Sequence, residues 1–188
     1  LVWDALTIAP ATTLALKPGT VVKFAAPADA LVVQGTLDAQ GAASALVAFT
    51  SVRDDAHGGD TDGAGPSTAA AGDWSAVRFA AGSTGRLAYT FIGYGGSGVS
   101  DAGGRYTVGM VESFSSDVTL DHITLHASAI DGLYTENTTV TFTNGTVSDN
   151  ARYGLNYHGL DAAVPLTVTG NTFSGSHGSA IRMDLHGN

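Results

Sequence analysis

The chain has 188 residues, enough for one domain with its own hydrophobic core, and it has no cysteine, so disulfide scaffolds and thiol chemistry are excluded. Eight lysines and arginines against 17 aspartates and glutamates give a net charge of -9, which argues against nucleic acid or an anionic membrane as a partner. Only 13% of the residues are charged and 44% are hydrophobic, which predicts a folded, strand-rich chain without membrane insertion.

The first fifty residues contain short apolar alternations separated by turn residues. The alternating pairs are Leu6/Ile8, Leu14/Leu16, Val22/Phe24, Leu31/Val33 and Val47/Phe49. Pro18-Gly19, Pro27 and Gly35 lie between them. Because a period of two residues is typical of half-buried strands, we predict two or three turns of a strand-rich coil in this region.

A long Gly-rich loop at 51-72 carries four carboxylates within nine residues. They are Asp54, Asp55, Asp60 and Asp62. Oxygen ligands on an adaptable loop suit calcium, so these four are candidate metal ligands and calcium is the one candidate cofactor. The spacing is not that of an EF-hand, because Ala71 stands where the closing glutamate belongs. The alternative interpretation is a solvated acidic loop without a metal.

The alternation resumes after this loop. We align Leu87, Tyr89, Ile92 and Tyr94 with the first four apolar positions of a repeat that begins at Val118. A Gly/Ser-rich loop at 95-105 then delays the next strand, which we expect near residues 108–112.

Three segments of 19 residues align without a gap: 118–136, 140–158 and 166–184. The apolar columns are Val118/Val140/Leu166, Leu120/Phe142/Val168, Leu125/Val147/Phe173 and Leu133/Leu155/Ile181. Each copy has the pattern strand, turn, strand, loop, strand. Such units bury their apolar residues only when stacked, so the repeat predicts an all-β, single-stranded parallel β-helix.

Small or turn-forming residues recur at fixed places in these repeats. Gly132, Gly154 and Ala180 precede the third strand, where we expect a tight corner, and Asn144-Gly145, Asp131-Gly132 and Gly170-Asn171 predict further corners. Over the whole chain we expect six to eight coils in one domain, 1-188. We also expect the chain to be a segment of a longer protein, with more coils or end-to-end association covering an end of the stack.

Several stretches of the N-terminal half carry a resemblance to a known family. They are LALKPGTVVKF at 14–24, LVVQGTLDAQG at 31–41, FTS at 49–51 and GDW at 72–74. The chain resembles the right-handed parallel β-helix repeat domains of large bacterial cell-surface and secreted proteins, which have the pectate-lyase-like fold. The resemblance implies a right-handed helix, an extracellular or cell-surface location, and adhesion or polysaccharide contact. The catalytic signatures of pectate lyases and polygalacturonases are not matched.

The third strand of each repeat offers a candidate binding face. Alternation sends two columns of side chains outward, Tyr134/Asn156/Arg182 and Glu136/His158/Asp184. We take Tyr134, Asn156 and Arg182 as candidate ligand-binding residues. Glu136, His158, Asp184 and Arg182 are the candidate catalytic residues of an alternative in which the face cleaves a polysaccharide as a lyase or glycoside hydrolase. Mutually satisfied surface charges are the simpler interpretation.

Threonines form a second regular feature. Thr119/Thr141/Thr167 and Thr124/Thr146/Thr172 are threonine in all three repeats. A threonine ladder on a flat face resembles ice-binding surfaces, although threonine is also simply a good residue for exposed strands. We therefore expect an extracellular structural or adhesive module, non-catalytic, that contacts polysaccharide or a surface protein and for which calcium at the acidic loop is a candidate stabiliser. Cleavage and ice binding are the alternatives.

Overall fold

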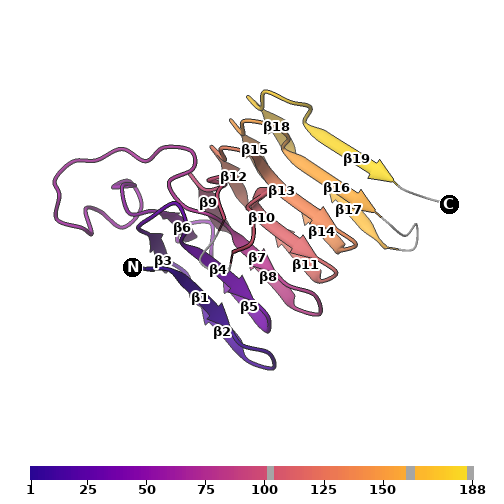
Figure 1. The fold of residues 1–188 in the computed structure, drawn as a ribbon, viewed down its shortest axis with the longest axis horizontal. Coiled ribbons are helices and arrows are strands. Elements are labelled where there is room, and N and C mark those ends of the chain that lie inside the picture. The colour runs from indigo at the N-terminus through magenta and orange to yellow at the C-terminus, as the bar shows by residue number, and fades with distance from the viewer. Residues whose placement is uncertain (101–103, 160–163, 186–188) are drawn as a thin grey trace.

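The computed structural model describes residues 1–100, 104–159 and 164–185. Within these ranges the chain forms nineteen strands and no helix, so no described helix could cross a membrane. All three sheets are parallel, and each successive turn of the chain supplies one strand to each of them. The chain is therefore a parallel β-helix, as the repeats predicted (Figure 1).

We call the three sheets I, II and III. Sheet I contains β1 (Ala5–Ile8), β4 (Ala30–Val33), β7 (Val77–Phe79), β10 (Gly109–Phe114), β13 (Asp131–Glu136), β16 (Leu155–Gly159) and β19 (Ile181–Leu185). Sheet II contains β2 (Thr13–Leu16), β5 (Thr36–Gln40), β8 (Thr84–Ala88), β11 (Asp117–Asp121), β14 (Thr139–Thr143) and β17 (Leu166–Thr169). Sheet III contains β3 (Val21–Phe24), β6 (Val47–Ser51), β9 (Thr90–Gly93), β12 (Thr124–His126), β15 (Thr146–Ser148) and β18 (Thr172–Ser174).

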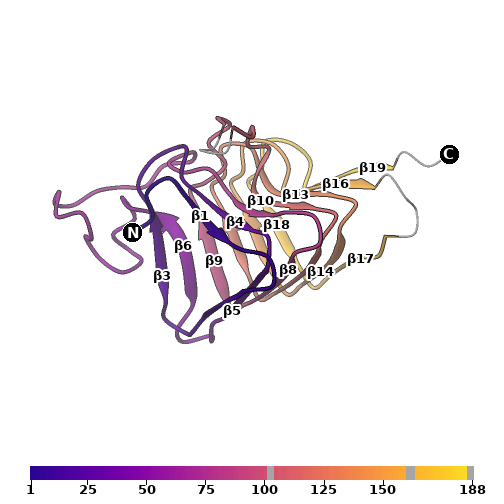
Figure 2. The same cartoon turned by 60° about the horizontal axis from the view of Figure 1, so that its bottom comes forward.

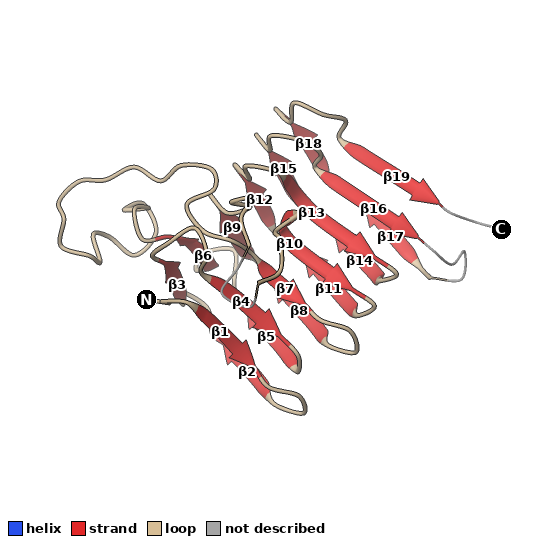
Figure 3. Cartoon of the chain, viewed as in Figure 1, coloured by secondary structure: helices blue, strands red, loops and turns tan. Residues whose placement is uncertain are grey.

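The chain thus makes six complete coils, from β1–β3 to β16–β18, and β19 begins the next (Figure 3). This agrees with the expected six to eight. The register within the repeats is also as predicted: Val118 pairs with Val140 and Val140 with Leu166, while Leu155 pairs with both Leu133 and Ile181. The apolar columns of the alignment are therefore continuous rows of stacked side chains inside the helix.

The core is one apolar cluster that runs along the axis of the helix. Two of its largest fully buried side chains, Phe24 and Trp74, lie in the N-terminal half, and their rings stack with centroids 4.2 Å apart. The indole Nε1 of Trp74 donates to the carbonyl of Gly93 at 2.8 Å, so its polar edge is satisfied although the side chain is fully buried. Figure 2 shows the coils stacked one behind another, and the three sheets surround this cluster.

The corners are made by residues in the left-handed backbone conformation, and these residues stack in columns from coil to coil. Tyr89, His122, Asn144 and Gly170 form the column between sheets II and III, with φ between 47° and 68°. The first three continue the ladder, since the amides of Tyr89, His122 and Asn144 donate to the carbonyls of Asp121, Thr143 and Thr169 at 3.0, 3.0 and 3.1 Å. The predicted corners at Asn144 and Gly170 are confirmed.

Two details of the prediction were wrong. Leu87 pairs with Leu120 and Ile92 with Leu125, so the upstream alignment was shifted by one in-out period and Tyr89 is a corner residue, not a core residue. Tyr94 is likewise a left-handed corner residue. A shift by two residues leaves the alternation of inward and outward side chains unchanged, so the sequence alone did not detect it.

Asp131-Gly132 is not a corner but the start of β13. A small residue is needed there because the next coil lies close, and not because of its backbone conformation. A Cβ on Gly132 would lie 2.8 Å from the carbonyl oxygen of Gly154, and one on Gly154 would lie 2.6 Å from that of Ala180. Close approach of successive coils therefore selects the small residues at this register.

Both long connections lie between sheet III and sheet I. The first, 52–76, joins β6 to β7 and projects from the N-terminal half (Figure 1). The second, 94–108, joins β9 to β10 and includes three residues outside the described ranges. These two connections border the outer faces of sheets III and I. The corners between sheets II and III are short and do not cover the outer face of sheet II.

Candidate functional site

The outer face of sheet I brings together the six side chains that the repeats placed in two columns. Tyr134, Asn156 and Arg182 are partners in register on β13, β16 and β19. Glu136, His158 and Asp184 are partners two residues further along the same strands. Neighbouring members of a column are therefore one strand spacing apart, about 4.8 Å.

Three rings form a line along this face, and we call Phe114, Tyr134 and His158 the aromatic track. The centroids of Phe114 and Tyr134 are 5.8 Å apart, and those of Tyr134 and His158 are 4.9 Å apart. All three side chains are half-buried, so each presents part of its ring to solvent. At one end, the guanidinium of Arg105 lies 3.7 Å above the ring of Phe114. The track therefore crosses three coils, parallel to the axis of the helix.

Phe114 and Arg105 were missed by the sequence reasoning. Phe114 pairs with Glu136, so it extends the Glu136/His158/Asp184 column one coil upstream. The signal was present, because Phe114 precedes Glu136 by the same offset as Glu136 precedes His158. Arg105 lies on the 94–108 loop and no periodicity could have placed it above a ring.

Charged and hydroxyl groups accompany the track. The hydroxyl of Tyr134 donates to Oε2 of Glu136 at 3.3 Å, and burial together with the Glu136 charge raises the pKa of Tyr134. Nδ1 of His158 is 3.7 Å from Oδ2 of Asp184, and the guanidinium of Arg182 donates to the same oxygen at 3.3 Å. Hydrogen-bonding groups of both signs thus lie beside an exposed strip of aromatic surface.

A buried polar layer supports this face from below. Asp131, at the start of β13, is fully buried and accepts from Arg152 at 3.1 and 2.9 Å, from the amide of Tyr153 at 3.1 Å and from Nδ2 of Asn156 at 2.8 Å. Asn156 is only 2% exposed. Its amide is therefore committed to Asp131, and the structure places this predicted ligand-binding residue beneath the surface rather than on it.

A second part of the layer is a buried ion pair between Arg78 of β7 and Glu112 of β10. The other oxygen of Glu112 accepts from the amides of Val108 and Gly109 at 2.6 and 3.2 Å, which fixes the end of the 94–108 loop. Arg152 adds a bond of 3.2 Å to the carbonyl of Val108. The outward side chains of Arg78, Glu112 and Asn156 are thus buried and structural, whereas those of the track are half-buried and reach solvent.

The carboxylates of the cleavage hypothesis are well separated. Glu136 and Asp184 lie two strands apart in one column, which is about 9.6 Å between backbones. Retaining glycosidases need carboxyl groups about 5 Å apart, and inverting enzymes about 6.5–9.5 Å. The two carboxylates therefore come from strands that are not neighbours, and the spacing of their backbones is wider than the retaining separation and close to the upper limit of the inverting one.

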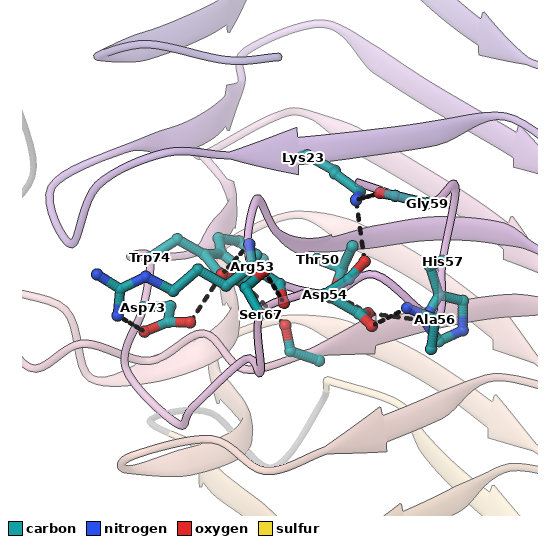
Figure 4. Close-up of polar contacts among 12 residues, drawn as sticks. Lys23, Thr50, Arg53, Asp54, Ala56, His57, Gly59, Ser67, Asp73 and Trp74 are labelled. Carbon is teal, nitrogen blue, oxygen red and sulfur yellow. Dashed lines mark hydrogen bonds and ion pairs between the residues drawn. The ribbon is translucent and has the colours of Figure 1, made fainter. Parts of the chain in front are cut away.

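The acidic loop is organised around a lysine (Figure 4). Lys23 of β3 is 2% exposed, and its ammonium group donates to the carbonyls of Asp54 and Gly59 at 2.9 and 2.6 Å. The Asp54 carboxylate is buried as well and accepts from Thr50 at 2.6 Å and from Nδ1 of His57 at 2.7 Å. These contacts fasten the first part of the loop to the outer side of sheet III.

The other three aspartates bind the loop's own backbone. Oδ2 of Asp55 accepts from the amide of Ser67 at 2.8 Å, and Oδ1 of Asp62 from that of Ala64 at 3.0 Å. Asp60 accepts from the amides of Gly63 and Gly65, and the Gly63 bond lowers its pKa. In the described part of the chain no three acidic or histidine side chains converge on a possible metal position. Calcium therefore stays a prediction from the sequence.

The threonines point outward as expected, but their two columns lie on different sheets and do not form one flat face. Thr119, Thr141 and Thr167 are partners in register on the outer face of sheet II, and Thr124, Thr146 and Thr172 on that of sheet III. Most of these side chains are exposed and the rest are half-buried. Ice binding by either column stays a prediction, since regular threonines also follow from strand propensity alone.

No protein-family model matches the chain, and no match was found among curated proteins or among solved structures. The functional argument therefore depends on the geometry of the faces just described.

Proposed function

We propose that this β-helix is an extracellular structural or adhesive module, with no catalytic role, that binds a polysaccharide along the outer face of sheet I. The observation that carries the proposal is the aromatic track, because pyranose rings pack their apolar faces on half-exposed aromatic rings. Glu136, Asp184 and Arg182 would hydrogen-bond sugar hydroxyls at the edges of the track. The saccharide chain would then run parallel to the axis of the helix and cross one strand after another.

The extracellular and bacterial setting is part of the same proposal. It is supported by the likeness of the N-terminal motifs to bacterial cell-surface β-helix repeats. A surface protein is the other partner considered, and a glycan panel distinguishes the two.

A matched pair of tyrosines tests the proposal. Tyr134 and Tyr89 each lie against a histidine of the next coil, with ring centroids 4.9 and 4.6 Å apart, but only Tyr134 belongs to the track. We expect the wild-type domain and Tyr89→Ala to be retained equally by an insoluble polysaccharide such as chitin, cellulose or pectin. Tyr134→Ala should be retained about fivefold less, because ring stacking contributes on the order of 1 kcal/mol. Equal retention of both variants would contradict the proposal, as would no retention on any polysaccharide.

Cleavage is the second candidate, because His158 and Arg182 accompany the two carboxylates on the same face. Loss of reducing-end or unsaturated-product formation in both Glu136→Gln and Asp184→Asn would establish it. Product formation that persists in both variants would rule out this face as the catalytic site.

Calcium stabilisation through the 51-72 loop is tested separately. An ion that binds only the folded state stabilises the folded protein. Tm should therefore rise with added calcium and fall with EDTA. The Asp60→Ala/Asp62→Ala variant should lose that response. A Tm that is the same in calcium and EDTA would contradict calcium binding.

A further inference from the structure

The carboxylates of sheet I are all paired with arginine except one. The strands of this sheet carry four of them. Three form ion pairs, which are Glu112 with Arg78, Asp131 with Arg152, and Asp184 with Arg182. Glu136 is the fourth, and it forms no ion pair with any residue that the structure describes.

Glu136 is half-buried, and within the described chain its carboxylate accepts one hydrogen bond, from the hydroxyl of Tyr134 at 3.3 Å. A carboxylate that loses part of its hydration without gaining a cation is left poorly compensated. A cationic group of a ligand would therefore pair with Glu136 more favourably than with the three carboxylates that already have an arginine.

Aromatic rings border this carboxylate. In its column Glu136 lies between Phe114 and His158, one strand spacing from each, about 4.8 Å between backbones. The ring of Tyr134 lies 5.8 Å from that of Phe114 and 4.9 Å from that of His158. A carboxylate beside aromatic faces is suited to an ammonium group, because the carboxylate pairs with the charge and the rings attract it through cation–π interactions.

The protein itself places a cation on one ring of the track. The guanidinium of Arg105 lies 3.7 Å above the ring of Phe114. At the far end of the column, the guanidinium of Arg182 donates to Asp184 at 3.3 Å. Each end of the column is therefore accompanied by a cation of the protein, whereas Glu136 in the middle has none. The contact of Arg105 shows, independently of Glu136, that this aromatic surface accepts a cation.

The charge of the whole chain points the same way. A net charge of -9 attracts a polycation and repels an acidic polysaccharide. Neutral and cationic polysaccharides are therefore the favoured classes for the track, and of these only a cationic one would pair with Glu136.

We propose that the aromatic track binds a polysaccharide with free amino groups, such as a de-N-acetylated glucosamine polymer, and that Glu136 binds one of its protonated amines. This inference rests on the proposed function and names its ligand class. The amine would donate to the Glu136 carboxylate while its sugar ring packs on the rings of Phe114 and Tyr134. A row of sugar rings matches a row of aromatic rings, whereas a lysine side chain has no flat face to stack, so an amino sugar is favoured over a basic peptide.

The test compares oligosaccharides of glucosamine with their fully N-acetylated counterparts, which share one backbone and differ in charge. Calorimetric titration at a pH where the amine is protonated gives the dissociation constant of each series. We expect the wild-type domain to bind the deacetylated series about tenfold more tightly, and Glu136→Gln to lose this difference, because hydrogen bonds to charged groups are stronger than neutral ones. Asp117→Asn removes the same charge from an exposed position on sheet II and should keep the difference.

A second readout needs no variant. The affinity of the wild type for the deacetylated series should fall as the pH is raised through the pKa of the sugar amine, and more salt should weaken it. The N-acetylated series should show neither trend. It also reports any contribution of the other charged and titratable groups at this face, which are Arg105, His158, Arg182 and Asp184.

Equal affinity of the wild type for the two series, or an unchanged difference in Glu136→Gln, would overturn the inference. Glu136-dependent binding of poly-lysine without binding of either series would also overturn it, and would assign the site to a basic peptide. If the N-acetylated series binds through Tyr134 while the difference between the series is absent, the inference fails and the proposed function stands. A difference that depends on Glu136, with neither series depending on Tyr134, gives the reverse.

Discussion

The first three coils and the last three are built on the same plan but are held together differently. Coils four to six, β10 to β18, repeat one pattern of apolar columns in register. Coils one to three contain the stacked Phe24 and Trp74 and the buried ammonium of Lys23. The comparison shows that a solenoid tolerates irregular coils when single buried groups replace the repeated contacts.

The largest effect is expected from a charge in the regular half. Leu155 is fully buried and lies between Leu133 and Ile181 in its column. Leu155→Asp should prevent folding or lower the free energy of unfolding by about 4 kcal/mol or more, because a charge would replace stacked apolar contacts. Leu185→Asp is the control, since Leu185 is 63% exposed on the same sheet. Equal Tm values for both variants would contradict the register.

The next effect concerns the junction between the two halves, where Arg78 of coil three pairs with Glu112 of coil four. Arg78→Met leaves the buried Glu112 charge without its guanidinium and should cost about 3–5 kcal/mol in urea unfolding. The double variant Arg78→Met/Glu112→Leu should recover part of this loss, because both charges are then removed. A double variant no more stable than the single one would mean that the two side chains do not act as a pair.

A smaller and local effect is expected in the irregular half. The chain has two lysines, of which Lys17 is exposed and Lys23 is buried against the carbonyls of Asp54 and Gly59. Lys23→Met removes both bonds and should lower stability by about 1–3 kcal/mol while increasing hydrogen exchange over 52–72. Lys17→Met should change neither quantity. Unchanged exchange in Lys23→Met would show that the loop is held by other contacts.

The smallest effect is electrostatic and lies in coil four. Bonds from Thr143, His122 and Asn144 lower the pKa of Asp121 from 3.8 to about 2. A lowered folded-state pKa means that this carboxylate stabilises the fold above pH 3.8 and loses its contribution as the pH falls toward 2. The side chain is 37% exposed, so solvent keeps the effect small. Asp121→Asn should therefore lose stability relative to wild type near neutral pH and converge with it near pH 2, whereas a constant difference across this range would contradict the assignment.

These differences also explain what the sequence could and could not predict. The register of coils four to six followed directly from the three aligned copies, because every apolar column repeats at a fixed position. In coil three the same alternation permitted a two-residue shift, and Tyr89 was placed in the core although its left-handed backbone puts it at a corner. Alternation fixes which residues point inward but not which pair of strands they align with.

In the candidate site too, some features could be predicted from the sequence and others could not. Tyr134, His158 and Glu136 could be placed on one face from strand periodicity alone. The burial of Asn156 and the position of Arg105 above Phe114 could not, because both depend on the long connections and on buried partners such as Asp131. Arg105 belongs to a loop outside the repeats, and Asp131 and Asn156 stand at different positions of two repeats, so no recurring spacing encodes either contact.

The most direct test of the central claim is a chain-length series. Oligosaccharides of increasing length, taken from the polysaccharide that retains the domain, are titrated while backbone amides of β10, β13 and β16 are followed by NMR. Binding along the track predicts shifts that spread from strand to strand and an affinity that rises with length until the saccharide spans Phe114 to His158. Shifts confined to another face, or an affinity independent of length, would contradict it.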